Sequence, residues 1–375
     1  MPKARFSSFD VRAMVLALRT QLVGFRVANV YDIDAKTYLL KLAKPDGKAT
    51  LLIQSGIRIH TTEFARDKSA VPSGFTLKLR KHLRQKRVER IEQLGSDRVV
   101  VITCGSGDYE SHLVVELYDK GNIILTDQSH SILTLLRNSK FDADSRLTVG
   151  QEYTLTSRLE AGAISRDALA DAMRSAEGTQ TAMKLMMRLL PLGKEMGEHS
   201  LLTAGLPLNT KMSTQPWEDE AMLERLEAAI ADANVLLASV EEQPGGIIIL
   251  KEPKKEGKQA ASSAPVPAAA DDAPAAEDVY EEFAPFELSQ HTGKRLVRFG
   301  SFSEAADDFF SKIEVQRAAA EYAAQQGAAW KKVDKIRAGI VNHRAPPICD
   351  APSSCHAPSR LLCCEYPKDR SFESL

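Results

Sequence analysis

Cysteine is scarce in this sequence of 375 residues. Cys104 is the only cysteine in the first 348 residues, and the other four lie between residues 349 and 364. Small secreted domains stapled by disulfides carry cysteines throughout, so this distribution excludes that class for most of the chain. It favours a reducing compartment instead.

Long apolar runs are also missing. No stretch approaches the roughly 18 consecutive apolar residues of a membrane-spanning helix. The first ten residues lack the apolar core of a secretion signal. We therefore expect no membrane partner and a location in the cytoplasm, with the nucleus as the alternative. The length allows two or three domains.

Familiar catalytic and metal-binding patterns are absent as well. The sequence has no phosphate-binding Walker motif, no Cys–His nucleophile pair before the tail and no carboxylate pair at catalytic spacing. The cysteines and the histidine near the end do not have the intervals of zinc ligands. We therefore predict a protein that is not an enzyme and has no metal and no cofactor. The rejected zinc candidates are Cys349, Cys355, His356, Cys363 and Cys364.

Charge is balanced over the whole chain but not locally. The formal net charge is -1, yet residues 78–90 hold seven Lys or Arg against the single acid Glu89. Such local basicity in a near-neutral protein is typical of a nucleic-acid surface, although a solvated helix face is the alternative. We assign backbone contacts to Lys78, Arg80, Lys81, Arg84, Lys86 and Arg87. Arg58 and His60 alternate onto one strand face just before this run, and we add them to the surface.

The first 160 residues predict an α+β domain with antiparallel sheets. Apolar spacing indicates a helix over 7–22, where Ser7 and Asp10 fit a capping box. A second helix has Phe75, Leu79 and Leu83 along its apolar edge. Period-two runs bounded by turn residues predict two series of strands. The first series is 26–31, 38–42, 50–54 and 57–60, and the second is 98–104, 112–118, 123–126 and 132–136.

The remaining chain divides by composition. Residues 161–244 favour short helices with glycine-containing turns, either a helix-hairpin-helix-like region or a small bundle. Residues 245–302 contain strands around an Ala/Pro-rich insert at 252–278, which we predict to be disordered. Residues 303–344 predict the start of a coiled coil. Residues 345–375 have no periodicity and are interpreted as an irregular, aberrant tail.

Five segments, in this order and spacing, resemble the NFACT family over residues 1 to about 340. They are RFSSFDV at 5–11, SGIRIHT at 55–61, PSGFTLKLRKH at 72–82, QLGSDR at 93–98 and FFSKIE at 309–314. The resemblance implies an N-terminal domain similar to that of the DNA glycosylase MutM, then a helix-hairpin-helix region and a coiled coil. The family's further C-terminal domains have no counterpart here, so we interpret the chain as truncated.

The same resemblance implies a role in ribosome-associated quality control. Family members bind large ribosomal subunits that hold a stalled peptidyl-tRNA, bring in aminoacyl-tRNA and support template-free C-terminal tailing of the nascent chain. Eukaryotic members also help the ubiquitin ligase listerin to dock. We expect the large subunit and tRNA as partners, and expect any listerin contact to suffer from the truncation.

Three residues match the family's tRNA-recognition positions, namely Asp10, Asp97 and Arg98. Carboxylates can accept hydrogen bonds from ribose hydroxyls or base amino groups, and an arginine can bind a phosphate or stack on a base. The alternatives are a helix-capping role for Asp10 and an ordinary solvated turn for the other two.

Two rival functions remain open. MutM-like glycosylases attack with an N-terminal proline, and this chain begins Met1-Pro2, but Lys3 replaces the acid expected next. A protein-only adaptor could instead use residues 280–286 and the long C-terminal helix without contacting RNA.

Overall fold

The computed structural model describes residues 2–138, 140–142, 145–156, 166–176, 180–189, 193–212, 220–239, 245–251 and 279–344. The insert predicted to be disordered at 252–278 and the tail at 345–375 lie outside these residues. The chain divides into two compact units, residues 1–316 and 317–375.

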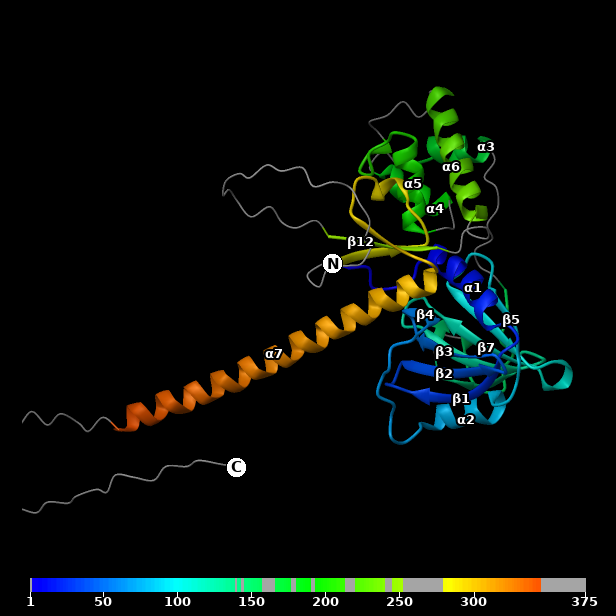
Figure 1. Cartoon of the computed structure of the whole chain (residues 1–375). Helices are drawn as coiled ribbons and strands as arrows, with labels where there is room; N and C mark the ends of the chain where they lie inside the picture. The colour runs from blue at the N-terminus through cyan, green and yellow to red at the C-terminus, as the bar shows by residue number, and fades with distance from the viewer. Residues whose placement is uncertain are drawn as a thin grey trace, which may run out of the picture. The chain divides into compact units, whose positions relative to one another are not determined.

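The first unit begins with a helix and a four-stranded antiparallel meander (Figure 1). Ser7 caps the helix, its side chain accepting from the Asp10 amide while the Asp10 carboxylate accepts from the Ser7 amide, so the predicted capping box is confirmed. The elements are α1 (Ser8–Leu22), β1 (Arg26–Asp32), β2 (Thr37–Lys44), β3 (Gly47–Gln54), β4 (Arg58–Thr61) and α2 (Gly74–Leu83).

A second antiparallel meander of five strands follows in sequence order. Its strands are β5 (Val88–Gln93), β6 (Val99–Cys104), β7 (Ser111–Glu116), β8 (Asn122–Asp127) and β9 (Ile132–Leu135), with a short 3-10 turn at Gly107–Tyr109. A two-stranded ribbon, β10 (Lys140–Asp142) and β11 (Ser145–Arg146), comes next. The predicted α+β class with antiparallel sheets is confirmed.

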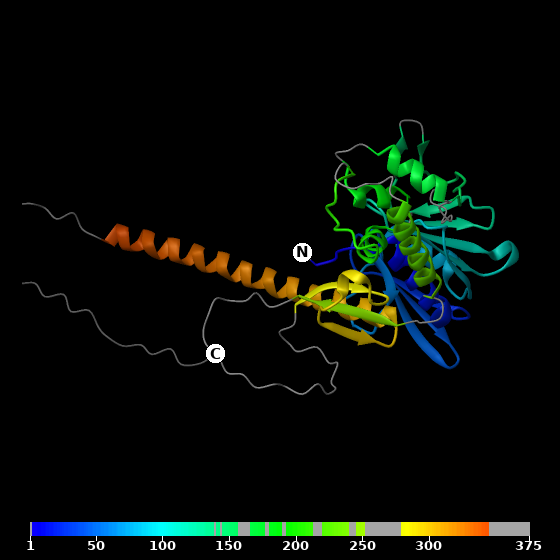
Figure 2. The same cartoon turned by 90° about the horizontal axis from the view of Figure 1, so that it is seen from above.

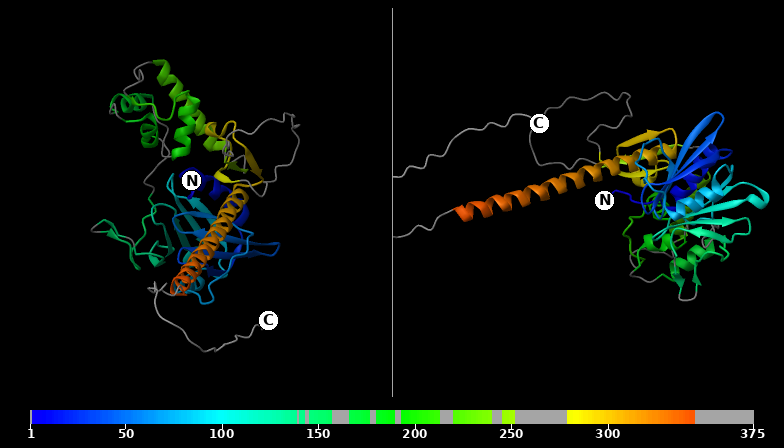
Figure 3. Two further views of the ribbon diagram at one scale, coloured as in Figure 1. Left: turned by 90° about the vertical axis from the view of Figure 1, so that its left-hand side faces the viewer. Right: turned by 90° about the horizontal axis from the view of Figure 1, so that it is seen from below.

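The two sheets share one apolar core. Residues from β1–β4, β5–β8, α1 and α2 belong to a single buried cluster, and α1 packs against β4, β5 and β6. Figure 3 shows the two sheets from two further sides. Turns of the two sheets meet where Gly56, at φ +75°, approaches the turn at Gly121. A Cβ on Gly56 would lie 2.9 Å from the Lys120 carbonyl carbon, so only glycine fits this approach.

A helical region with its own core follows the sheets. Its helices are α3 (Arg166–Arg174), α4 (Ala182–Leu189), α5 (Lys194–Thr203) and α6 (Glu220–Ser239). Leucine, methionine and alanine side chains from all four helices form a separate buried cluster. Residues 190–192, in one of the glycine-containing turns expected over 161–244, lie outside the described residues.

A three-stranded antiparallel sheet lies beside the first turns of α7 (Figure 2). Its strands are β12 (Gly246–Leu250) in the centre, β13 (Tyr280–Ala284) and β14 (Leu296–Phe299), with a 3-10 turn at Ser289–His291. Helix α7 spans Phe302–Arg344. Phe6, Phe283, Phe302, Phe309 and Phe310 pack their rings together with centroids 4.8–6.1 Å apart, which joins the start of the chain, β13 and α7.

The second unit contributes the rest of α7. From residue 317 to residue 337 every described side chain is exposed, including Tyr322 and Trp330. The helix agrees with the predicted helical pattern, while its pairing into a coiled coil stays a prediction. Among the helices that the structure describes, none is long and apolar enough to cross a membrane.

Candidate nucleic-acid interface

A cleft of about 510 Å³ opens within the first unit, where the start of the chain, two strand turns and two helix ends come together. The β5–β6 turn supplies Asp97 and Arg98, and the β7–β8 turn supplies Tyr118. Five cationic side chains and two acidic ones line it, so the cleft favours an anionic ligand. These are Lys3, Arg5, Arg98, Arg188 and Lys194, with Asp97 and Glu195.

The turn that carries Asp97 and Arg98 is held by its backbone. The Asp97 amide donates to the Leu94 carbonyl at 3.0 Å, and the Arg98 carbonyl accepts from the Leu117 amide at 2.7 Å. Gln93 Nε2 donates to the Asp97 carbonyl at 2.9 Å. Both side chains are half-buried in the cleft wall. The structure therefore brings two of the three predicted recognition residues together in a fixed turn.

Arg98 has an unusual electrostatic setting. Burial, followed by the neighbouring Arg5 cation, lowers its pKa from the ordinary arginine value, and Glu195 opposes this effect. The guanidinium still carries its charge at neutral pH because the pKa of an ordinary arginine lies far above neutrality. Two crowded guanidinium groups at a partly dehydrated surface form a favourable site for a phosphate.

Asp10, the third predicted residue, is fully buried beside the cleft and does not line it. Its Oδ2 accepts from the Ser7 amide at 2.8 Å and from Lys3 Nζ at 2.8 Å. Burial raises the pKa of Asp10 to about 6, against the opposing effect of Lys3. In this structure Asp10 can therefore influence a ligand only through Ser7 and Lys3, which do line the cleft.

Lys3 connects four parts of the first unit. Its Nζ lies 2.8 Å from Asp10, 3.2 Å from Glu195 and 3.9 Å from Glu282, and it donates to the Phe283 carbonyl at 3.1 Å. Burial lowers its pKa, but the three carboxylates outweigh burial and raise the pKa above the ordinary lysine value. Lys3 therefore stays charged and fixes the cleft wall to α1, α5 and β13.

The basic run at 78–90 is not a single helix. Helix α2 ends at Leu83, Gln85 takes a positive φ of 68°, and β5 begins at Val88. Lys78, Lys81, Arg84 and Arg87 are exposed. The other two predicted contacts are half-buried and engaged, since Arg80 Nε donates to the Val30 carbonyl at 2.7 Å and Lys86 Nζ to Ser111 Oγ at 2.8 Å.

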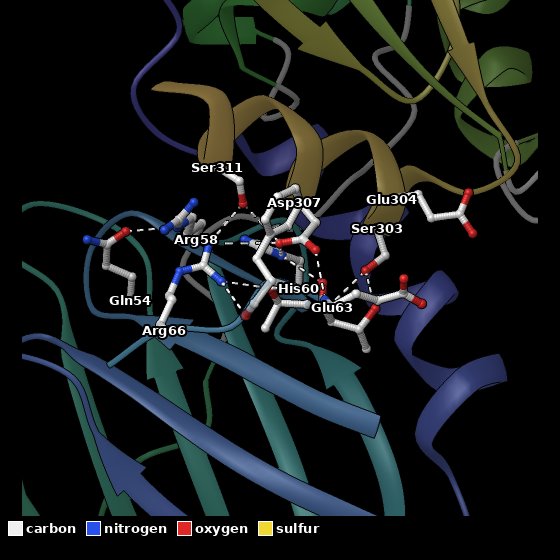
Figure 4. Close-up of polar contacts among 12 residues, drawn as sticks. Gln54, Arg58, His60, Glu63, Arg66, Ser303, Glu304, Asp307 and Ser311 are labelled. Carbon is white, nitrogen blue, oxygen red and sulfur yellow. Dashed lines mark hydrogen bonds and ion pairs between the residues drawn. The ribbon is translucent and has the colours of Figure 1, made fainter. Parts of the chain in front are cut away.

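The predicted extension of this surface to Arg58 and His60 is wrong in this structure. Strand alternation does place both on one face, but the first turns of α7 cover that face (Figure 4). Arg58 is only 1% exposed, pairs with Glu314 and lies 4.3 Å from the centre of the Phe310 ring. His60 is fully buried and stacks on the same ring, and burial lowers its pKa well below the ordinary value.

Sequence reasoning missed several residues of the cleft, among them Tyr118, Arg188 and Glu195. They lie outside the five family-like segments and reach the cleft only through folding. Arg5 could have been found from the sequence, because it is the first residue of the first of those segments.

No group of three or more His, Cys, Asp or Glu among the described residues could hold a metal ion.

Comparison with known proteins identifies the family. The description "NFACT N-terminal and middle domains" matches residues 7–338. This chain belongs to the NFACT family. Among NFACT relatives, the human ribosome quality control complex subunit NEMF is 39% identical over 340 residues, covering 89% of this chain and 30% of that protein. Ribosome quality control complex subunit 2 of Saccharomyces cerevisiae is 28% identical, covering 90% and 36%. The chain thus spans about a third of the length of these NFACT relatives.

Two solved structures of bacterial proteins align with this chain, one of them well enough to show a shared fold. The fibrinogen binding protein from Staphylococcus aureus aligns with a TM-score of 0.54 at 17% identity, covering 81% of this chain and 98% of that one. The MutM protein from Thermus thermophilus aligns with a TM-score of 0.31 at 14% identity, covering 64% and 77%. The first likeness shows a shared fold.

Proposed function

We propose that this chain acts in ribosome-associated quality control and binds tRNA in the cleft that contains Asp97 and Arg98. Two findings support the proposal. The chain belongs to a family whose curated members are named ribosome quality control complex subunits. The two residues that match the family's recognition positions lie side by side in a cleft with excess positive charge.

The observation that carries the proposal is the combination of acids and cations in one cleft. Cations attract any phosphate backbone but do not distinguish one RNA from another. The Asp97 and Glu195 carboxylates can accept hydrogen bonds from base amino groups or ribose hydroxyls, which allows the site to select. A fixed turn holds Asp97, so little conformational freedom is lost on binding.

The proposed role is binding and positioning rather than catalysis. The chain would bind large ribosomal subunits that carry peptidyl-tRNA and present a tRNA, and the ribosome would form the bonds during template-free tailing. We propose the cytoplasm as its location. A contact with listerin rests on the family resemblance alone.

Binding of fluorescently labelled tRNA to an Asp97→Asn/Arg98→Gln variant tests the proposal. We expect affinity to fall about tenfold or more, because each lost charge-assisted hydrogen bond costs about 1.5–3 kcal/mol. A matched control is Asp171→Asn/Arg174→Gln, which neutralises an exposed pair on α3 whose charged atoms lie 2.9 Å apart. Equal tRNA affinity of the cleft variant and the wild type, with both folded by circular dichroism, would refute the assignment.

Two further measurements test alternatives to a selective tRNA site. Failure of tRNA to outcompete heparin for the cleft would indicate a general polyanion site. Ribosome co-sedimentation that survives mild RNase treatment would favour a protein-only adaptor.

A further inference from the structure

A tyrosine on the four-stranded sheet has three cations around its ring. Lys68 Nζ lies 4.9 Å, Arg80 Cζ 5.3 Å and Lys41 Nζ 5.6 Å from the centre of the Tyr31 ring. These four residues, called here the Tyr31 cluster, come from β1, β2, α2 and the segment between β4 and α2. We propose that the Tyr31 cluster is a second RNA site, which binds the phosphate backbone of a single-stranded segment.

The fold fixes the ring and one of the cations. Asn29, two residues earlier on β1, donates from Nδ2 to the Tyr31 hydroxyl at 3.0 Å, and it pairs directly across the ladder with Lys41. Lys41 therefore projects on the same face of the sheet as Tyr31. Arg80 is anchored because its Nε donates to the Val30 carbonyl at 2.7 Å.

The segment that carries Lys68 is also tied to β1. The Ser69 amide donates to the Asp32 carbonyl at 2.9 Å, and the Ser73 amide donates to the Asp32 carboxylate at 3.0 Å. Asp32 is only 7% exposed, and its carboxylate is occupied by this backbone contact. The cation on Lys68 is thus brought to the ring by backbone hydrogen bonds rather than by a surface ion pair.

The cations of the cluster have no acidic partner in the part of the chain that the structure describes. Within the described part of the chain, no ion pair joins Lys41, Lys68 or Arg80 to a carboxylate. Arg66, two residues before Lys68, shows the contrast, since it lies 3.1 Å from Glu314. Three positive groups held near one ring repel each other, and a bound anion would relieve this repulsion. The contacts of the cations with the ring offset this repulsion only in part, because such contacts are weak at an exposed site.

The surroundings favour a nucleic acid over an acidic peptide. The exposed Lys78 and Lys81 lie on the same helix as Arg80, so the cationic surface extends beyond the cluster. Cations combined with an accessible aromatic ring are typical of sites for single-stranded nucleic acid. Tyr31 is half-buried, so part of the residue stays exposed to solvent, next to which a base of the bound strand would lie.

The Tyr31 cluster differs from the cleft in residues and in selectivity. None of its four members lines the cleft. The cleft contains acidic side chains that can select an RNA, whereas the cluster offers cations and a ring that accept any sequence. The inference goes beyond the proposed function and uses a different probe, so either can fail without the other.

The test uses a labelled single-stranded RNA of uridines and fluorescence anisotropy at several salt concentrations. We expect Lys41→Gln/Lys68→Gln to bind about tenfold more weakly. We also expect the slope of log affinity against log salt to become shallower by about 1.4, since each lost phosphate contact on a single strand removes about 0.7. The matched control Lys36→Gln/Lys48→Gln removes two exposed lysines of the same sheet, one in the β1–β2 turn and one at the start of β3, and should bind as the wild type does.

A second pair of variants tests the ring. Tyr31→Leu keeps every charge but removes the aromatic face, so we expect binding to weaken about threefold, while Tyr31→Phe should bind as the wild type does. An unchanged affinity and salt slope in the lysine variant would overturn the inference, as would wild-type binding by Tyr31→Leu. Absence of any uridine-RNA binding by the wild type would also overturn it. Equal competition by polyglutamate would assign the cluster to an acidic protein instead.

Discussion

At the scale of single residues, burial decides what each charged side chain can do. Asp10 and Asp97 both match recognition positions of the family, yet Asp10 is fully buried and Asp97 is half-buried in the cleft wall. A carboxylate sealed from solvent can orient its neighbours but cannot touch an RNA. In the proposed RNA site the two acids would therefore have different parts, with Asp10 supporting its neighbours and Asp97 in contact.

The buried Asp10 predicts a specific pH dependence of stability. Its pKa is raised from an ordinary value of 3.8 to about 6 in the folded protein, so the folded state binds this proton more tightly than the unfolded state. The resulting stabilisation is present below about pH 4 and is lost as the pH rises through about 6. Asp10→Asn cannot titrate at this position. Its free energy of unfolding, relative to that of the wild type, should therefore rise by up to about 3 kcal/mol as the pH increases from 4 to 7.

Urea unfolding of both proteins at intervals between pH 4 and pH 7 measures this difference. Asp108→Asn, which changes an exposed aspartate in the turn between β6 and β7, is the control and should show no such trend. A free-energy difference between wild type and Asp10→Asn that is independent of pH would contradict the assignment.

At the scale of secondary-structure elements, local pattern predicted most of the two meanders. The helix expected over 7–22 is α1 at Ser8–Leu22, and the strand expected over 123–126 is β8 at Asn122–Asp127. Strand β5 was missed because half of its residues, Val88–Gln93, are charged and the strand directly follows a basic run. Alternation gave the shared face of Arg58 and His60 correctly, but it could not show that a helix some 250 residues later covers that face.

The contact between β4 and α7 depends on a buried cation. Arg58 is 1% exposed, and Glu314 pairs with it and also with Arg66, at 3.1 Å. Burial lowers the pKa of Arg58 to about 10, with Glu314 opposing that effect, so the guanidinium stays charged at neutral pH. Removing the carboxylate charge would leave a cation in the interior without its closest partner.

Glu314→Gln is therefore expected to destabilise the first unit by about 1–3 kcal/mol. Breaking a buried ion pair typically costs about 3–5 kcal/mol, and we expect less here because Glu314 is 43% exposed. Chemical denaturation monitored by circular dichroism measures the change. Glu321→Gln, at an exposed position of the same helix, should alter stability by less than about 0.5 kcal/mol. Equal stability of the two variants would show that the pair is not needed.

At the scale of the whole molecule, the cleft depends on segments that are far apart in the sequence. Lys3, Asp97 and Glu195 contribute to one wall although nearly 100 residues separate each from the next. Local periodicity contains no information about such meetings. The family-like segments indicated Asp97 and Arg98, whereas Arg188 and Glu195 became visible only once the helical region was placed beside the strand turns.

The two units should also differ in how firmly their helix is held. Between Phe302 and Ile313, α7 buries aromatic and alanine side chains in the main core, whereas described side chains from 317 to 337 are exposed. The exposed part gains no stability from the core, and most helical stability in proteins comes from tertiary packing. Hydrogen exchange measured by mass spectrometry should therefore show strong protection of amides 306–316 and weak protection of amides 320–337.

Uniform protection along α7 would contradict this expectation and would indicate that a second helix packs on residues such as Tyr322 and Trp330, as in the predicted coiled coil. Repeating the measurement over a range of protein concentrations would then distinguish a second copy of the chain, whose protection weakens on dilution, from a segment of the same chain.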